Sequence, residues 1–201
     1  LNPSSAASDV YKRQTKGAMN MIEPGSDKHQ QSGLFLIGGP SQHNGWDESI
    51  LIKQIAQILD ANPIIQWTLT SSRRTPPSTT AQLEKLSKEQ LKVIPVEATD
   101  KGWLPRELST TAHVWVTEDS VSMVYEALSS GAKVGLLPIP RKSTRSRVVC
   151  GLESLNQDGY LMNYRENQAD LAAFKNPPPL NEAERVAKIV AERFLASRIS
   201  P

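Results

Sequence analysis

The sequence predicts an α/β fold in which a parallel β-sheet carries helices on both of its faces. Short apolar or β-branched segments alternate with amphipathic segments of helical length along most of the chain. The first strand-like segment, 34–39, is a continuous apolar run that ends in two glycines, a pattern typical of a strand buried on both faces. Strands that alternate with helices are joined by right-handed crossovers, so we expect them to run parallel.

Each predicted strand is short and rich in branched or aromatic side chains, which suit a pleated and buried surface. Pro95 weakens the third strand, because proline cannot donate a backbone hydrogen bond to a sheet. We expect the segment at 133–139 to be the last strand. The predicted strands are 34–39, 64–70, 91–96, 113–117 and 133–139.

The predicted helices show apolar side chains spaced three or four residues apart, together with end signals. Asp47 is a favourable N-cap for the first helix, and Gly131 stands where a helix that begins at Ser120 needs a C-cap glycine. In the last helix we expect four apolar side chains to form an inner face: Val186, Ile189, Val190 and Phe194. The predicted helices are 48–60, 79–90, 104–111, the one from Ser120, 144–157 and 182–198.

A chain of 201 residues accommodates one full domain, and we expect its polar beginning to lie outside that domain. Residues 1–14 resemble a translated sequencing-adapter tail, and residues 15–32 are polar and without periodicity. We therefore expect residues 1–33 to be a disordered or non-native tail and linker, and residues 34–201 to form the domain. Because the chain begins with leucine, we also expect it to be a fragment of a longer protein.

Composition and charge exclude several classes of protein. A net charge of +2 gives no general attraction to nucleic acid. The single cysteine excludes an intrachain disulfide and a cysteine-based zinc site, and the three histidines are too dispersed for a metal cluster. We therefore expect no metal and no resident cofactor. The sequence shows neither a run of about 18 apolar residues nor a secretory signal, so we expect a cytoplasmic location.

Polar residues follow the predicted strands, at the edge where parallel sheets bind their ligands. Gly38 and Gly39 let backbone amides approach an anion closely, and the Ser41 hydroxyl adds a donor. Arg73 and Arg74 follow the second strand, and a guanidinium can bind a phosphate or carboxylate through two parallel hydrogen bonds. A plain strand-to-loop turn and a pair of solvated arginines are the alternatives.

The segment after the fourth strand adds polar groups at the same edge. Asp119 and Ser120 stand at a helix start, which suits a bound anion, although acids there also complement the helix dipole. Glu126 lies two turns into this helix among apolar neighbours. A ligand hydroxyl would satisfy its carboxylate, and a solvent-facing position is the alternative. The basic run 141–147 is a further candidate for contact with a phosphorylated ligand, with a solvated loop as its alternative.

Three motifs in series resemble a known family. They are LIGGPSQHNGW (36–46), WTLTSSRRTP (67–76) and VTEDSVSMVYEALSSGAKV (116–134). All three are similar to segments of the elongated-mitochondria family of mitochondrial-fission proteins and their bacterial relatives. The similarity spans roughly residues 34–164, and three motifs in order are far more specific than any one of them.

That family is in turn similar to the C-terminal half of GT-B glycosyltransferases, which implies a Rossmann-like domain of the nucleotide-sugar-binding type. In that half, a Gly-Gly-Ser loop follows the first strand, and the resemblance places Gly38, Gly39 and Ser41 there, near the diphosphate of a donor. A helix glutamate binds the ribose in those enzymes, and the matching residue here is Glu126. The resemblance therefore implies a nucleotide-sugar ligand.

By this resemblance, the full protein would be a nucleotide-sugar-dependent glycosyltransferase, with Arg73 or Arg74 as the counter-charge of the diphosphate. The acceptor site and the catalytic base usually belong to the other domain, so we expect this chain alone to be inactive. The sequence identifies no catalytic residue. The expected partner is a nucleotide sugar or another phosphorylated ligand and not nucleic acid. An NAD-dependent enzyme is disfavoured, because the first strand is not followed by GxGxxG.

The alternative is a non-catalytic, peripheral factor that binds proteins in organelle or envelope dynamics. Glycosyltransferases usually carry glycines before the helix, where this chain has Asp119 and Ser120, and this departure favours the alternative. Its partners would be a protein or a membrane surface, and its location would be peripheral to a membrane.

Overall fold

The computed structural model describes residues 15–86, 89–143, 146–164, 169, 171, 174 and 179–194. Within these residues, six strands form one sheet in the order β3-β2-β1-β4-β5-β6, and every neighbouring pair is parallel. The strands are β1 (His29–Leu36), β2 (Gln66–Thr70), β3 (Leu91–Ile94), β4 (Thr111–Thr117), β5 (Lys133–Leu137) and β6 (Leu161–Asn163). The strand order reverses between β1 and β4, which lie side by side at the centre.

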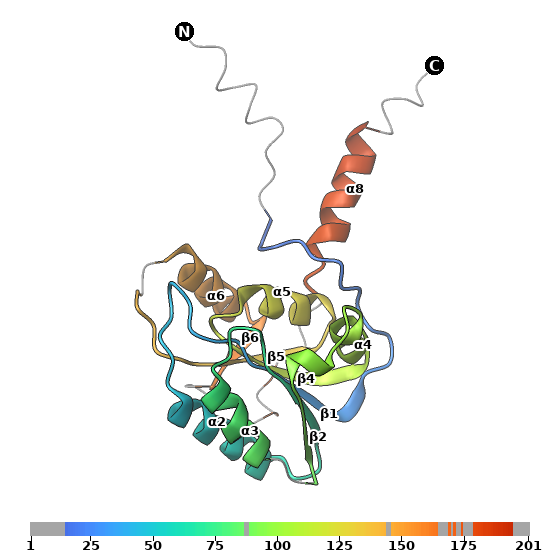
Figure 1. Cartoon of the computed structure of the whole chain (residues 1–201). Helices are drawn as coiled ribbons and strands as arrows, with labels where there is room; N and C mark the ends of the chain where they lie inside the picture. Colours follow the sequence, from blue (N-terminus) through green and yellow to red (C-terminus); the bar gives the residue numbers. More distant parts are fainter. Residues whose placement is uncertain are drawn as a thin grey trace, which may run out of the picture.

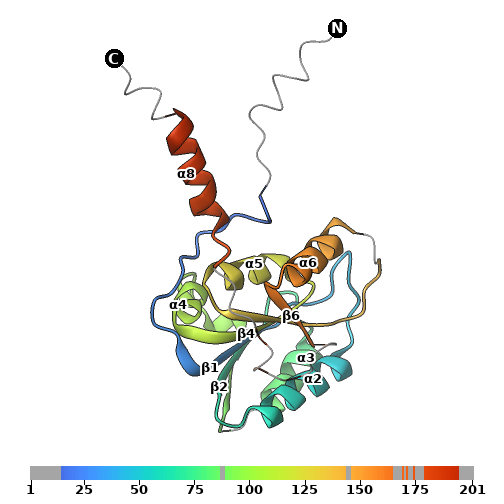
Figure 2. The same cartoon turned by 180° about the vertical axis from the view of Figure 1, so that it is seen from behind.

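Helices cover both faces of this sheet, as Figures 1 and 2 show from opposite sides. One face carries α2 (Glu48–Ala61) and α3 (Pro77–Lys85). The other carries α4 (Trp103–Thr110), α5 (Val121–Ser129) and α6 (Arg147–Gln157). A short 3₁₀ turn, η1 (Val96–Ala98), follows β3, and α8 (Glu182–Phe194) projects away from the domain. The predicted Rossmann-like α/β class is confirmed.

Two hydrophobic clusters hold the layers together, one on each face of the sheet. Leu34 and Leu36 of β1 point into the cluster under α5 and α6, whereas Phe35 and Ile37 point into the cluster under α2 and α3. All four side chains are fully buried. Full burial of such a side chain stabilises the fold by about 1.5–3 kcal/mol relative to exposure, so the alternation along β1 fixes the sheet between its layers.

The local end signals act as the sequence predicts. The Asp47 carboxylate accepts a hydrogen bond from the amide of Ile50 at 3.1 Å and caps α2. Gly131 follows α5 with a φ of 78°, a left-handed conformation that favours glycine.

The start of the domain differs from the prediction. Strand β1 begins at His29 instead of residue 34, and its first three residues are polar because they are exposed. Before it, Ile22 is buried, and the Gly25 amide donates to the Ser130 carbonyl at 3.0 Å. The prediction of a linker is therefore wrong for residues 29–33, which belong to β1, whereas residues 15–28 form no helix or strand but contact the domain, and residues 1–14 lie outside the described residues.

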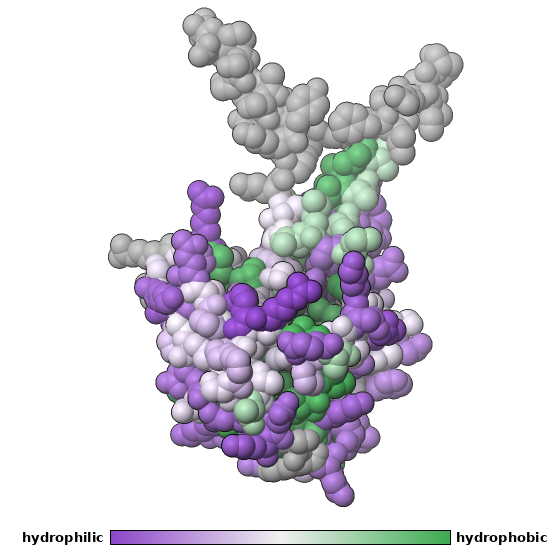
Figure 3. Space-filling view, in the orientation of Figure 1, coloured by the Kyte–Doolittle hydropathy of each residue, from purple (hydrophilic) through white to green (hydrophobic). Residues whose placement is uncertain are grey.

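Two further predictions fail near the other end. The segment at 133–139 is not the last strand, because β6 pairs with β5 through three residues, too few to show a periodic pattern. Nor does the predicted inner face of the last helix point inward as a whole: Val186 and Ile189 are half-buried, but Val190 is not. Val190 is 48% exposed, since α8 stands clear of the sheet layers, and Figure 3 shows apolar side chains along its visible surface. The Phe194 side chain lies outside the described atoms.

His113 on β4 makes the stability of the fold depend on pH. Burial, and secondarily the charge of Lys133, lowers the pKa of His113 from 6.5 to about 4. The unfolded chain therefore takes up this proton first, so the free energy of unfolding falls as the pH drops from about 6.5 towards 4. We expect a loss of about 3 kcal/mol from this residue, because one pKa unit corresponds to about 1.4 kcal/mol.

Urea unfolding of the protein and its His113→Gln variant at several pH values measures this effect. The difference between the two free energies should change across this pH range and stay constant above pH 7. A constant difference at every pH would contradict the role assigned to His113.

Candidate anion site at the carboxyl edge of the sheet

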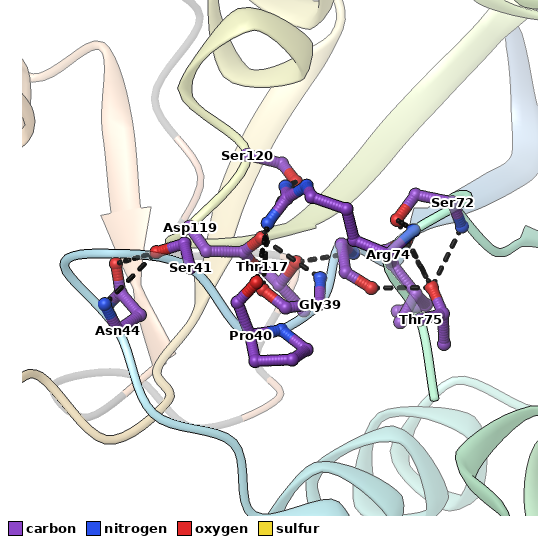
Figure 4. Close-up of polar contacts among 12 residues, drawn as sticks. Gly39, Pro40, Ser41, Asn44, Ser72, Arg74, Thr75, Thr117, Asp119 and Ser120 are labelled. Atoms are coloured by element: carbon purple, nitrogen blue, oxygen red, sulfur yellow. Dashed lines mark hydrogen bonds and ion pairs between the residues drawn. The ribbon is translucent and has the colours of Figure 1, made fainter. Parts of the chain in front are cut away.

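Three loops meet where β1, β2 and β4 end, at the point where the strand order reverses (Figure 4). The chain leaves β1 towards α2 on one face of the sheet and leaves β4 towards α5 on the other. The loops therefore diverge and leave polar groups between them. In parallel sheets this is the position at which ligands bind.

The two glycines after β1 bring their backbone amides against the loop after β4. The Gly38 amide donates to Thr117 Oγ1 at 2.8 Å, and the Gly39 amide donates to Asp119 Oδ2 at 3.0 Å. A Cβ atom at position 38 would lie 2.2 Å from Asp119 Oδ2, and one at position 39 would lie 2.1 Å from the carbonyl oxygen of Arg74. Position 39 is therefore sterically restricted to glycine by backbone, whereas a side chain at position 38 would have to displace the side chains of Asp119 and Ser120.

Arg74 bridges all three loops. Its Nη1 donates to the carbonyl oxygens of Gly39 and Pro40, at 2.9 and 3.2 Å. Its Nη2 donates to Asp119 Oδ2 at 2.7 Å and to the Ser120 hydroxyl at 3.1 Å. The side chain is 44% exposed, so the guanidinium can also be approached from solvent.

Asp119 occupies the centre of the site. Its side chain is fully buried, and Oδ2 accepts hydrogen bonds from the Gly39 amide, the Arg74 guanidinium and the Ser120 hydroxyl at 3.0, 2.7 and 3.2 Å. Its Oδ1 is also buried, and it has no hydrogen-bond partner among the described residues. An amide, a guanidinium and a hydroxyl that converge on one oxygen form an anion site, and here the anion is a carboxylate of the same chain.

Two threonines support this geometry: Thr117, whose hydroxyl the sequence places with Asp119 and Ser120 at a strand end, and Thr75, which the sequence analysis did not single out. Thr75 Oγ1 donates to the Gly38 carbonyl oxygen at 2.5 Å and accepts from the Ser72 amide at 2.8 Å, which fixes the loop that carries Arg74. Thr117 Oγ1 accepts the hydrogen bond from the Gly38 amide. Thr75 lies in the loop after β2, at the same edge of the sheet, and this position is the signal that could have identified it.

The other predicted site residues lie outside this cluster. Arg73 is exposed, and it makes no hydrogen bond or ion pair within the described part of the chain. The Ser41 hydroxyl accepts from the amides of His43 and Asn44 at 3.2 and 3.0 Å and closes its own turn. The structure thus brings together Gly38, Gly39, Arg74, Asp119 and Ser120, and within the described residues no hydrogen bond joins the side chain of Arg73 or Ser41 to them.

Glu126 lies on α5, about 7.5 Å along the helix axis from Val121, given a rise of 1.5 Å per residue. It is half-buried, and this burial raises the pKa of its carboxyl group. No hydrogen bond or ion pair joins its carboxylate to the residues that the structure describes. Glu126 thus keeps its capacity to accept hydrogen bonds from a ligand.

A second ion pair fastens the neighbouring loop. Glu118 accepts from the Ile139 amide at 3.2 Å and from Arg141 Nε at 2.6 Å, and Arg141 also contacts Glu153 at 3.1 Å. The first arginine of the basic run 141–147 is therefore engaged by carboxylates. Positions 144 and 145 of that run lie outside the described residues.

Two searches of the described residues complete this picture. No three His, Cys, Asp or Glu side chains gather there as a metal ion would require. None of the helices in this part of the chain is long and apolar enough to span a membrane.

The fold defines a Rossmann-like α/β domain, and a candidate anion site lies at its topological switch point. The family model described as Mitochondrial fission ELM1 matches residues 10–194, and the chain belongs to this family. The match begins inside the segment that we expected to be a non-native tail and linker. The chain shows no match to a curated protein.

Two solved structures are similar to the chain, and the first of them shows the same fold. One is a protein from Listeria monocytogenes assigned as a UDP-N-acetylglucosamine 2-epimerase, with 15% identity and a TM-score of 0.50. The similarity covers 90% of this chain and 50% of that protein, so the chain spans about half of its length. Another is the C-terminal domain of a group 1 glycosyl transferase, LpcC, from Francisella tularensis, with 14% identity, a TM-score of 0.40 and coverage of 86% and 95%.

The adjacent arginines Arg73 and Arg74 allow a direct test of how the site is held together. Arg74→Gln should lower the free energy of unfolding by about 1–2 kcal/mol, because the buried Asp119 carboxylate loses its charged partner and the half-exposed arginine moderates the loss. Arg73→Gln removes the same charge one residue away and should change it by less than about 0.5 kcal/mol. Urea unfolding measures the free energy of unfolding of both variants. An equal decrease in the two variants would refute the assigned role of Arg74.

Proposed function

We propose that the edge formed by the loops after β1, β2 and β4 binds the diphosphate of a nucleotide sugar. The observation that carries this proposal is the convergence of the Gly39 amide, the Arg74 guanidinium and the Ser120 hydroxyl at the switch point. These groups already hold a carboxylate, which supports an affinity of the site for anions. Backbone amides beside glycines and an arginine suit phosphate oxygens equally well.

Residues close to this site are candidates for contact with the ribose and the other parts of a nucleotide sugar. Glu126 is half-buried, and its carboxylate has no hydrogen-bond partner among the described residues, so it is our candidate for the ribose hydroxyls. Its place on α5, beyond the helix start that carries Ser120, is consistent with a ribose beyond the diphosphate. Ser41 and Arg73 lie nearby in sequence and stay candidates for the outer contacts of the donor.

In this proposal the whole protein is a nucleotide-sugar-dependent glycosyltransferase, and the chain supplies its donor-binding domain. The acceptor site and the catalytic base would come from another domain, so the chain alone would be inactive. A cytoplasmic location suits such a donor, and no resident cofactor is required. The name of the Listeria protein, with half of which the chain shares its fold, makes UDP a suitable first probe.

A non-catalytic role is the second candidate, and one observation favours it. The Asp119 carboxylate fills the anion site and is itself completely buried. A domain whose ligand site is permanently closed by its own side chain would be a fold retained for binding proteins, including partners at a membrane surface. Nucleotide binding separates the two candidates.

Calorimetric titration of UDP, GDP and ADP tests the proposal. We expect at least one of them to bind. Glu126→Gln should weaken its affinity more than tenfold, because the ribose hydroxyls lose charge-assisted hydrogen bonds to the carboxylate. A factor of ten in affinity corresponds to about 1.4 kcal/mol. Inorganic pyrophosphate is the matched control, because it lacks the ribose and should bind both proteins equally. If no nucleotide binds at millimolar concentration, the enzymatic proposal is lost. If the unmodified protein and Glu126→Gln bind a nucleotide with equal affinity, only the role of Glu126 is lost.

A further inference from the structure

Asp119 makes the same contacts that a bound phosphate oxygen would make. Its Oδ2 takes the Gly39 amide, the Arg74 guanidinium and the Ser120 hydroxyl, each within 3.2 Å. It also lies against Gly38, in the space that a Cβ atom would fill. We infer that Asp119 is a built-in competitor for the ligand phosphate, whose carboxylate must leave before the phosphate can bind. This inference rests on the proposed function, because it concerns the same site.

Electrostatics excludes simultaneous occupancy. The carboxylate is fully buried, and one guanidinium faces it. A phosphate placed on the same amide and guanidinium would stand a few ångströms from a second negative charge, where the repulsion is strong in a partly buried site. The site therefore holds either Asp119 or a phosphate.

Two features make exchange feasible. Asp119 Oδ1 is buried without a hydrogen-bond partner among the described residues, so the closed state leaves one carboxylate oxygen unsatisfied. Arg74 is anchored through Nη1 to the carbonyl oxygens of Gly39 and Pro40, whereas Nη2 holds Asp119. Nη2 can therefore pass from the carboxylate to a ligand while Nη1 keeps its place.

The competition sets a threshold for ligands. A small anion has to displace Asp119 with phosphate contacts alone and should bind weakly. A nucleoside diphosphate gains additional contacts through its ribose and base, and these contribute to the displacement. Asp119 is thus a specificity-determining residue that favours nucleotide-linked phosphates over free ones.

The test is the affinity of the 201-residue chain for inorganic pyrophosphate and for UDP, measured by calorimetry on the protein and on Asp119→Asn. The variant keeps the shape of the side chain and removes its charge, so we expect pyrophosphate to bind at least tenfold more tightly. Glu153→Gln is the matched control. It removes one negative charge from a residue that contacts Arg141 instead of the anion site, and it should leave the affinity unchanged.

Each outcome decides the matter. Tighter pyrophosphate binding by Asp119→Asn alone supports the competitor, even if the unmodified protein binds no nucleotide and the proposed function fails. Equal or weaker binding by the variant overturns the competitor, even if UDP binds the unmodified protein and the proposed function stands. If neither pyrophosphate nor UDP binds the unmodified protein or Asp119→Asn, the competitor role of Asp119 and the proposed function are both overturned. If Asp119→Asn does not fold, Asp119→Ser removes the same charge and is judged by the same comparison.

Discussion

The carboxyl edge of this sheet depends on the absence of side chains at two successive positions. A Cβ atom at Gly38 or Gly39 would lie within 2.2 Å of the loop after β4 or the loop after β2. Without those atoms, the three loops approach closely enough for Arg74 to bond with all of them. Glycine thus acts here through close approach of the backbone and not through a special backbone angle.

The loop after β4 joins the two sides of the sheet through two adjacent carboxylates. Glu118 binds Arg141 beyond β5, and Asp119 binds Arg74 beyond β2. Since β4 lies between β1 and β5, these two ion pairs fasten the outer loops to the centre of the sheet from opposite directions. The same residues that could serve a ligand therefore also stabilise the closed form of the edge.

The sequence allowed the layers and the edge to be predicted, because hydrophobic periodicity and parallel topology determine both. It placed Gly38, Arg74 and Asp119 at one edge correctly, since parallel strands end together. It could not show that Asp119 would pair with Arg74, because a carboxylate at a helix start has several possible partners. The start of β1 could not be predicted either, because its first residues are exposed and carry no apolar pattern.

Helix α8 has a consequence for local dynamics. It is tied to the domain at its base, where the Lys16 amide donates to Glu182 at 2.9 Å and the Leu180 amide, just before the helix, donates to the Leu128 carbonyl at 3.2 Å, while the exposed Val190 lies farther along. Amide protection against hydrogen exchange follows burial and contact density. Backbone amides in the outer turns of α8 should therefore exchange long before those of β1 and β4, and opening of this helix would leave the sheet intact.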